Sequence, residues 1–443
     1  MSIDSTTLSA SNAVSLIRQG NLTVEQYAKA LLSRIAQRDP IVHAWAYIDP
    51  EYVLDQARKL DRVPIEHRGP LHGIPVAIKD IALTKDMPTR YNSDIYRSSH
   101  SSSVDAACVI TLRAAGALLL GKTHTTEFAA TTDGGPCVNP LNIGHTPGGS
   151  SSGSAAAVAD FQAPIALGTQ TGGSIVRPAS YTGIYGFKPT WGAISREGLA
   201  QYSISCDTPG FFARTIEDLE LLTDVYRFED VAQPEQATEF QIQGARVGFI
   251  KTHVWDLAPA GPGLKEVWEK AKNLLIEHGA IVEEIDWPDD DFNKLTDWHW
   301  AIINGEGRSA FHGHYTLDKQ NLSQFLVDQV ENNLNFSRED LLDALDRSAR
   351  LRPIWDRFSE RFEVILTPSA PDIAPEGTHF TGDARFCGPW TLLHVPCLNL
   401  PGISGGKSLP IGLTLVSGRY RDRHVLKTGK IIGDIFESTK ANS

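Results

Sequence analysis

Apolar residues near the start of the chain follow helical spacing. The pattern over Ala13–Arg18 is amphipathic and ends at Gly20, and Thr23 with Gln26 resembles a capping box that begins a second helix. The apolar positions of this second helix share one face, and they are Val24, Tyr27, Leu31, Leu32 and Ile35. We therefore expect two packed helices to open the chain.

Short apolar runs then alternate with helical patterns. Gly73–Ile81 (GIPVAIKDI), Ala117–Leu120 and Pro164–Leu167 have the composition of short buried strands. Val104–Ala115 and Ala155–Ala159 have the pattern of buried helices. Strands that alternate with helices predict an α/β fold.

The same alternation continues to the end of the chain. Helices are expected over residues 216–226, around 267–275 and over most of 298–361, with a polar connection over 230–239. Strands are expected over 245–251, around 281–282, over 364–366 and over 411–416. The later strands are therefore expected to extend the core that the earlier ones begin.

Length and charge narrow the class of protein. The chain has 443 residues, of which 41% are hydrophobic and 21% are charged, as in ordinary soluble globular proteins. That length could hold two or three average domains or one large domain. The formal net charge is −12 and no run of Lys or Arg is present, which argues against nucleic acid or an anionic membrane as the main partner. Small-molecule chemistry is favoured instead.

The cysteines and the N-terminus carry little functional signal. The cysteines are odd in number, widely spaced and never arranged as CxxC, so we expect reduced thiols in or near the core: Cys108, Cys137, Cys206, Cys387 and Cys397. The N-terminus lacks a basic region followed by an apolar stretch, and no segment approaches eighteen apolar residues. We expect an untargeted, cytoplasmic protein without a structural metal.

Two familiar patterns lack the context that their chemistry needs. Gly116–Thr123 (GALLLGKT) matches the phosphate-loop pattern, but its variable positions form an expected strand and Thr-His-Thr-Thr follows Lys122, so we expect no ATP or GTP site. Ser151 is the centre of a G-x-S-x-G sequence, but no apolar strand leads into it. His124 and His145 lack metal-ligand spacing and receive no catalytic role.

The segment Thr146–Pro178 places Ser150 and Ser174 directly after Gly-Gly pairs. Glycine permits tight turns and close approach to backbone N–H groups, so such a serine can lie beside ready-made hydrogen-bond donors. A nucleophile beside an oxyanion hole needs this arrangement. A flexible Gly/Ser linker would lack periodicity, and the apolar runs within the segment argue against it.

Lys79 interrupts the apolar run PVAIKDI. It either points outward from a half-exposed strand or lies buried with polar partners. The outward arrangement is ordinarily the more common, but the serine clusters favour the buried one. A lysine with a pKa of about 10.4 is neutral in roughly one molecule in two thousand at pH 7. A pKa of about 7.5 would cost the charged form roughly 4 kcal/mol, which burial can supply.

Several ordered motifs together resemble one enzyme family. They are Gly69–Asp80 (GPLHGIPVAIKD), Gly121–Phe128 (GKTHTTEF), Gly148–Ala156 (GGSSSGSAA), Gly168–Ala179 (GTQTGGSIVRPA), Gly186–Pro189 (GFKP), Cys206–Thr215 (CDTPGFFART) and Pro396–Val416. The chain resembles the amidase signature family of serine hydrolases over most of its length, from about residue 10.

The resemblance implies roles for particular residues. It assigns Lys79 as general base and acid, Ser174 as nucleophile, and Ser150 as proton relay after a cis Gly149–Ser150 peptide. The implied oxyanion hole consists of the backbone N–H groups of Thr171, Gly172, Gly173 and Ser174. Lys79 would draw a proton through Ser150 while Ser174 attacks the carbonyl. Amine would leave first, and water would then release the acid, without a cofactor.

The resemblance also implies a single large α/β domain over residues 1–443, with a mixed, mostly parallel twisted sheet flanked by helices. Within it we expect an N-terminal helical segment over about 1–65 and a catalytic core over about 66–230. A helical cover over about 298–361 and C-terminal core strands complete this division.

The implied activity is hydrolysis of a C–N acyl bond in a small or medium-sized organic molecule, either an amide or a carbamate. Partners would then be the small-molecule substrate, with no nucleic acid and no membrane, and a homodimer is left open. The alternatives are the amide-hydrolysing subunit of a glutamine-dependent tRNA amidotransferase and an esterase. A binding protein on an inactive scaffold is disfavoured because the implied triad is complete.

Other residues near the motifs are weaker candidates. Gln170 stands where many members of the family have Asp, and Arg177 lies three rather than two residues after Ser174, so the support by an Asp–Arg pair is in doubt. Ser151, Ser152, Asp207 and Arg214 are expected to have structural roles. The substrate pocket is expected to include Ala129, Ala130, Thr131, Thr132, Trp300 and Trp390, with His312, His314 and Phe386 as further candidates.

Overall fold

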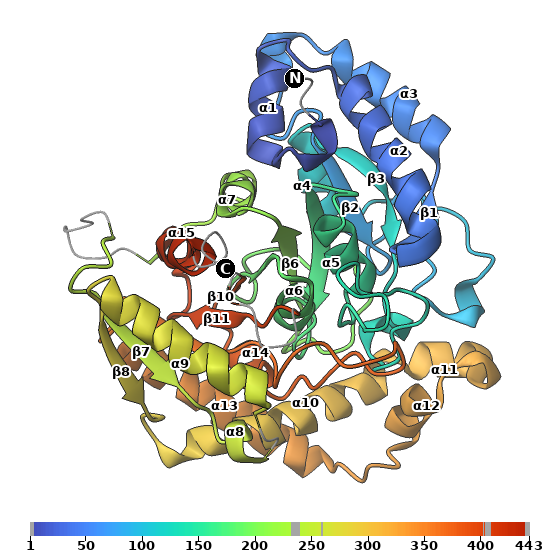
Figure 1. Cartoon of the computed structure of the whole chain (residues 1–443). Coiled ribbons are helices and arrows are strands. Elements are labelled where there is room, and N and C mark those ends of the chain that lie inside the picture. The colour runs from blue at the N-terminus through green and yellow to red at the C-terminus, as the bar shows by residue number, and fades with distance from the viewer. Residues whose placement is uncertain (1–3, 232–239, 258–259, 402, 404–408, 439–443) are drawn as a thin grey trace.

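A single twisted sheet organises the molecule (Figure 1). The computed structural model describes residues 4–231, 240–257, 260–401, 403 and 409–438. Within these residues the sheet has eleven strands, in the spatial order β1 (Trp45–Ile48), β3 (Leu118–Thr123), β2 (Pro75–Lys79), β4 (Ile165–Gln170), β6 (Thr208–Ala213), β5 (Tyr185–Lys188), β10 (Cys397–Leu400), β11 (Leu413–Val416), β9 (Val364–Pro368), β7 (Arg246–Ile250) and β8 (Ile281–Ile285). The prediction of one large α/β domain is confirmed.

The sheet is mixed, as expected, but it is not mostly parallel. Parallel pairs join β2 to β3 and β4, and join β7 to β8 and β9. The other six of the ten pairings between the described strands are antiparallel. The difference arises mainly in the centre, where successive neighbours from β4 through β6, β5, β10 and β11 to β9 are all antiparallel.

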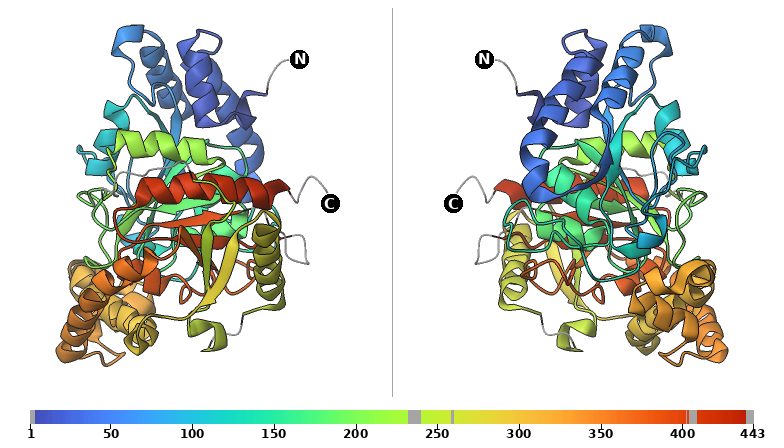
Figure 2. Two further views of the ribbon diagram at one scale, coloured as in Figure 1. Left: turned by 90° about the vertical axis from the view of Figure 1, so that its left-hand side faces the viewer. Right: turned by 90° about the vertical axis from the view of Figure 1, so that its right-hand side faces the viewer.

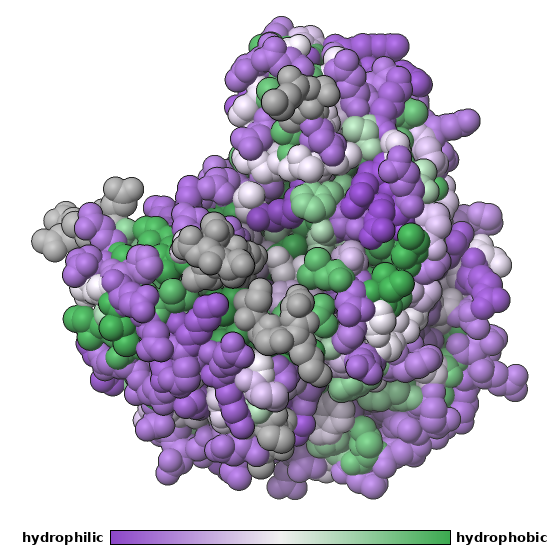
Figure 3. Space-filling model, viewed as in Figure 1, coloured by the Kyte–Doolittle hydropathy of each residue, from purple (hydrophilic) through white to green (hydrophobic). Residues whose placement is uncertain are grey.

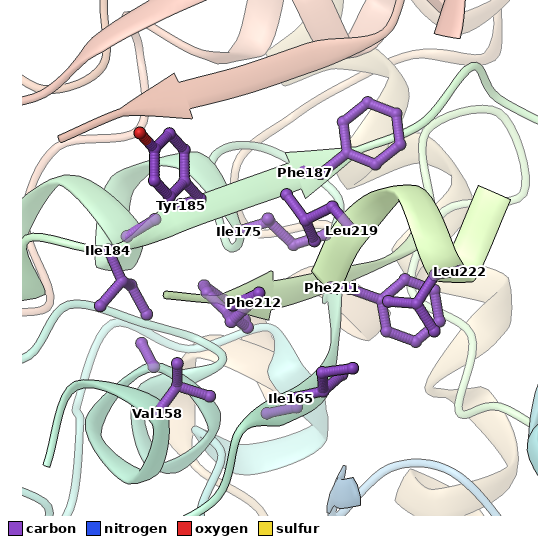
Figure 4. Packing of buried hydrophobic residues seen from close by; sticks show 14 of the residues in the cluster. Val158, Ile165, Ile175, Ile184, Tyr185, Phe187, Phe211, Phe212, Leu219 and Leu222 are labelled. Carbon is purple, nitrogen blue, oxygen red and sulfur yellow. The ribbon is translucent and has the colours of Figure 1, made fainter. Parts of the chain in front are cut away.

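Helices cover both faces of the sheet (Figure 2). One face carries α5 (Ser152–Ala159) and α6 (Val176–Thr182), and the other carries α7 (Ile216–Val225) and α15 (Asp422–Ser438). Figure 4 shows Phe211 of β6 against Leu222 of α7, and both side chains are buried. Strands β2, β3 and β4 are buried at every position, so each begins in the sequence as a short apolar run before its polar residues.

The N-terminal helices confirm the first sequence pattern. They are α1 (Ala10–Arg18), α2 (Val24–Val42) and α3 (Pro50–Asp61), which lie at the top of Figure 1. Thr23 and Gln26 form the predicted capping box of α2. The predicted buried face of α2 is largely confirmed, although Leu32 is only partly buried.

The expected helical cover is present in the lower part of Figure 1. It consists of α10 (Leu295–Ala310), α11 (His312–Asp318), α12 (Gln324–Glu331) and α13 (Arg338–Ser359). These helices enclose a second apolar cluster that includes Trp355 and Trp390. The remaining described α-helices are α4 (Ala107–Ala114), α8 (Val254–Leu257), α9 (Pro262–Glu277) and α14 (Gly388–Leu392). The finer division of the domain into segments stays a prediction.

Most of the polar connection expected over residues 230–239 lies outside the described residues. The five cysteines are free and buried, as expected. Figure 3 shows a face on which hydrophilic residues predominate and apolar residues form separate patches. None of the described helices is long and apolar enough to span a lipid bilayer.

Candidate active site

Lys79 is buried, so the arrangement in which it points outward is wrong. It is the last residue of β2, between the parallel strands β3 and β4, and its exposed fraction is 0%. Its Nζ atom lies 2.8 Å from Ser150 Oγ, 2.9 Å from Ser151 Oγ and 2.9 Å from Thr169 Oγ1. Burial holds the pKa of Lys79 well below its usual range, and the nearby Asp207 carboxylate opposes this shift.

The loop before α5 brings Ser150 to the lysine. The Gly149–Ser150 peptide is cis, as the resemblance to the amidase signature family implies. Arg177 Nη2 donates to the Gly149 carbonyl oxygen at 2.7 Å, and both residues are buried. Gly148 has φ of +85°, and a Cβ there would press against Pro178, so this turn requires glycine. Arg177 therefore supports the relay loop even though its spacing departs from the common pattern.

Ser151 does more than the expected bonding to the glycine-rich backbone. Its Oγ atom donates to the Thr169 carbonyl oxygen at 3.2 Å and accepts from the Thr169 N–H at 3.3 Å, as expected of a structural serine. The same atom also contacts Lys79, which the sequence did not indicate. Ser151 and Thr169 thus join Ser150 as hydroxyl partners of the lysine.

Ser174 lies in the turn that connects β4 to α6, where 8% of its surface is exposed. Gln170 Oε1 accepts from the backbone N–H groups of Ile175 and Val176, at 2.9 and 3.0 Å. Gln170 Nε2 donates to Thr391 Oγ1 at 2.9 Å, and this hydroxyl donates to the Gly172 carbonyl oxygen at 2.8 Å. The side chain of Gln170 therefore holds both ends of the turn: directly at Ile175 and Val176, and through Thr391 at Gly172.

Donors remain available inside this turn. Within the described residues, no hydrogen bond engages the backbone N–H groups of Gly172, Gly173 and Ser174. A Cβ at Gly173 would lie 2.9 Å from Cys387 Sγ, which explains why glycine occupies this position. Such a turn can present N–H groups to a developing negative charge.

Thr171 is held at two points. Its hydroxyl donates to Asp207 Oδ1 at 2.6 Å, and its carbonyl oxygen accepts from His299 Nε2 at 2.8 Å. Burial raises the pKa of Asp207 to about 6 and lowers the pKa of His299. His299 belongs to α10, 128 positions from Thr171, and no sequence pattern marked it. Asp207 was expected to be only structural, although it lies within a recognised motif.

A narrow pocket lies beside these residues. It is lined by Ile81, Phe128, Ala129, Thr169, Thr171, Arg196, Leu199, Ala200, Gln201, Tyr202, Asp207, Thr208 and Pro209. Ala129 is the candidate from the sequence that lines it. Within the part of the chain that the structure describes, no group of three or more His, Cys, Asp or Glu side chains is arranged to hold a metal ion.

The other pocket candidates lie elsewhere. Ala130 and Thr131 are partly buried and Thr132 is exposed, next to Ala129 in the sequence.

The aromatic and histidine candidates differ in burial. Trp390 is 1% exposed and packs against Trp287 and Trp355. Phe386 is fully buried in the main core, whereas Trp300 is 44% exposed and His312 is also exposed. His314 contacts the Tyr96 hydroxyl and stacks on Phe128, a lining residue.

The comparison that decides the family covers most of the chain. A family model described as Amidase matches residues 26–426. This chain belongs to the amidase signature family.

One relative with a similar sequence and two similar solved structures show which proteins this family member resembles. The A subunit of glutamyl-tRNA(Gln) amidotransferase from Streptomyces coelicolor is 32% identical over an alignment of 481 positions. This alignment covers 97% of this chain and 96% of the relative. A crystal structure described as an amidase is 26% identical, with a TM-score of 0.85. The match covers 98% of this chain and 100% of the amidase chain. The structure of native peptide amidase from Stenotrophomonas maltophilia is 25% identical, with a TM-score of 0.77. The match covers 98% of this chain and 97% of the peptide amidase chain.

The first of these comparisons corrects one expectation. We expected a small-molecule substrate to be the partner of this amidase, without nucleic acid. The relative from Streptomyces coelicolor is named as a component of an amidotransferase for glutamyl-tRNA. That likeness, which spans nearly the whole of both chains, contradicts the expectation of a small-molecule partner alone.

Proposed function

We propose that this amidase hydrolyses a C–N acyl bond through an acyl-enzyme on Ser174, with Lys79 as the base and Ser150 as the relay. The observation that carries the proposal is the contact of 2.8 Å between Lys79 Nζ and Ser150 Oγ in a fully buried environment. A lysine whose pKa is held well below its usual range can be neutral near pH 7, and only the neutral amine can accept a proton.

The reaction then proceeds in two balanced halves. In the first half, Lys79 accepts the Ser150 proton, Ser150 accepts the Ser174 proton, and Ser174 Oγ bonds to the substrate carbonyl carbon. The C–N bond breaks, and the proton returns through Ser150 to the leaving nitrogen. In the second half, water gives its proton along the same path and attacks the ester, which frees the acid and Ser174. The first half ends in the acyl-enzyme with Lys79 neutral again, and the second half restores the free enzyme.

Negative charge develops on the substrate oxygen in both halves. The N–H groups of Gly172, Gly173 and Ser174, which have no hydrogen-bond partner among the described residues, can supply donors within the nucleophile turn. Donors that are already in place at such an oxygen commonly lower the barrier by about 3 kcal/mol. We include the Thr171 N–H in this oxyanion hole, as the resemblance to the family implies.

We infer further that the protein is the amide-hydrolysing component of a complex. Glutamine would be the acyl donor, the acyl-enzyme a γ-glutamyl ester of Ser174, and the leaving group ammonia for use by a partner. The likeness to the A subunit of the amidotransferase, over 97% of this chain and 96% of the relative, supports this inference. A likeness over nearly the full length of both proteins extends well beyond the signature motifs.

The test compares the purified chain with the assembly that it forms in its own cells. We expect the chain alone to release ammonia from glutamine slowly, and the affinity-purified native assembly to release it faster. Protein without partners that turns over anilides, carbamates or esters, and leaves glutamine untouched, would contradict the role within a complex.

The matched control is Ser174→Ala, in the chain alone and in the assembly. All turnover is expected to disappear in this variant, because the nucleophile is gone. Undiminished hydrolysis in Ser174→Ala would reject the acyl-enzyme itself, whichever substrate is used.

A further inference from the structure

Two threonines lie between Lys79 and a buried carboxylate: Thr169 in β4 contacts the lysine, and Thr171, just after β4, contacts Asp207. Thr169 Oγ1 lies 2.9 Å from Lys79 Nζ, and Thr171 Oγ1 lies 2.6 Å from Asp207 Oδ1. Thr169, Thr171 and Asp207 all line the narrow pocket. The amine and the carboxylate are therefore neighbours on one side of the site.

Asp207 is held by several hydrogen bonds, and with a pKa raised to about 6 by burial it is mostly ionised at pH 7. Its Oδ2 atom accepts from the Tyr202 and Ser203 backbone N–H groups at 2.8 and 3.0 Å. Among the described residues no side chain forms an ion pair with it. Arg196 is the cation that faces it, and the guanidinium lies over the Trp191 ring, 4.7 Å from the centroid.

The other acidic group near Lys79 is already paired. Asp80 follows Lys79 in the chain, but its Oδ1 atom lies 3.1 Å from Lys122 Nζ, and it also accepts from the Arg90 N–H. Asp207 is the charged group that acts on Lys79 across the site. Proton uptake by a buried amine creates a positive charge that needs such a counter-charge.

We propose that Asp207 is a positioning residue with two effects: it fixes Thr171 at the start of the nucleophile turn, and it balances the ammonium that Lys79 becomes. The proposal rests on the proposed function, because Lys79 becomes an ammonium only when it accepts the Ser174 proton through Ser150. Among the described residues, the hydrogen bonds of the Asp207 side chain go to Thr171, Tyr202 and Ser203 and not to Ser174.

The sign of its effect follows from charge. Burial lowers the pKa of Lys79, and the Asp207 carboxylate raises it. Removal of the carboxylate charge should therefore lower the pKa of Lys79 further. The base would stay neutral at lower pH, but the ammonium formed during the reaction would be less stable. The acidic limb of the pH profile should move to lower pH while the maximal rate falls.

The experiment measures the rate at which a fluorophosphonate labels Ser174, as a function of pH. In the wild type this rate should rise through the pKa of Lys79. In Asp207→Asn we expect the midpoint to move to lower pH by at least about half a unit. The maximal rate should fall about tenfold. A midpoint that is unchanged, or that moves to higher pH, overturns the proposal, because a purely structural role would change only the maximal rate.

The matched control is Asp422→Asn. Asp422 is also buried, accepts from a backbone N–H and a threonine hydroxyl of Thr190, and has a pKa raised to about 6 by burial. It lies at the start of α15, outside the site. Its variant should keep the wild-type midpoint, and a shift equal to that of Asp207→Asn would also overturn the proposal.

A second pair of variants tests the proposal if Asp207→Asn does not fold. Thr171→Val removes the hydroxyl bonded to Asp207 and should slow labelling about tenfold, whereas Thr171→Ser should restore it. A wild-type rate in Thr171→Val overturns the positioning role. Failure of the wild-type protein to label at Ser174 would instead reject the proposed function, so the two failures are distinguishable.

Discussion

Each hydrogen bond that the structure gives to Lys79 Nζ joins it to a hydroxyl group, of Ser150, Ser151 or Thr169. Hydroxyl groups can donate or accept, so this environment satisfies both the neutral amine and the ammonium. Lys122 is equally buried but contacts the Asp80 carboxylate, which favours the charged form. The hydrogen-bond partners therefore distinguish Lys79, which can exchange protons, from Lys122, which has a structural role in the core.

Lys79→Arg tests this proton exchange. The guanidinium stays charged at any pH that the protein tolerates, so it cannot act as a base. We expect the rate of Ser174 labelling to fall by about 100-fold to 10,000-fold. Wild-type labelling should rise with pH and level off well below the usual lysine range, because burial lowers the pKa of Lys79. A profile that still rises near pH 10 would contradict this account.

At the scale of elements, α5 delivers the relay serine because its first turn packs against neighbouring backbone. A Cβ at Gly153 would overlap the Ala44 carbonyl oxygen and the His124 amide nitrogen. The Gly153 N–H also donates to the His124 carbonyl oxygen at 3.0 Å. The position therefore has no room for a larger residue, and it fixes where the loop with Ser150 ends.

Gly153→Ala should destabilise the protein for this reason. The backbone on both sides must shift, and overpacking of a core position commonly costs about 1–3 kcal/mol. Thermal or denaturant unfolding measures the loss. The control is Gly313→Ala in α11, where the added Cβ meets open space and alanine favours the helix by up to about 1 kcal/mol. Equal stability of the two variants would contradict the packing argument.

The elements also show how far the sequence could be interpreted. Short apolar runs predicted β2, β3 and β4, which are buried on both faces. The central strands β5, β6 and β10 were not predicted from pattern, since their runs are short and are interrupted by Gly or Pro in β5 and β6 and by Asn399 in β10. Antiparallel pairing in the centre of the sheet was missed with them.

The residues of the site also fall into those that the sequence indicated and those that it did not. Motifs indicated Lys79, Ser150 and Ser174, because the chemistry needs these residue types within glycine-rich backbone. They did not indicate that Thr169 contacts the lysine or that His299 binds the nucleophile turn. A contact between residues 128 positions apart depends on tertiary packing, which single-sequence patterns do not contain.

At the scale of the whole molecule, the helical cover is coupled to the core through His299. The Thr171 carbonyl oxygen can only accept, so His299 Nε2 must carry a proton. Burial lowers the pKa of this histidine, so the neutral form with Nε2–H is favoured. Helix α10 thus helps to hold the turn that carries Ser174, and the cover contributes to the geometry of the site.

His299→Leu and His299→Gln test this coupling as a pair. Loss of the donor in the leucine variant should slow Ser174 labelling about tenfold, because one buried hydrogen bond is worth about 1 kcal/mol and the carbonyl oxygen is left unpaired. Glutamine can still donate and should recover most of the rate. If both variants label at the same rate, the bond to Thr171 has no part in positioning the turn.

The central claim is that Ser174 carries the acyl group and Lys79 activates it. The most direct measurement is peptide mapping by mass spectrometry after reaction with a fluorophosphonate. We predict one adduct, on Ser174, which is absent from Ser174→Ala and strongly reduced in Lys79→Arg. An adduct on Ser150, Ser151 or Ser152, or labelling that persists in Ser174→Ala, would contradict the claim.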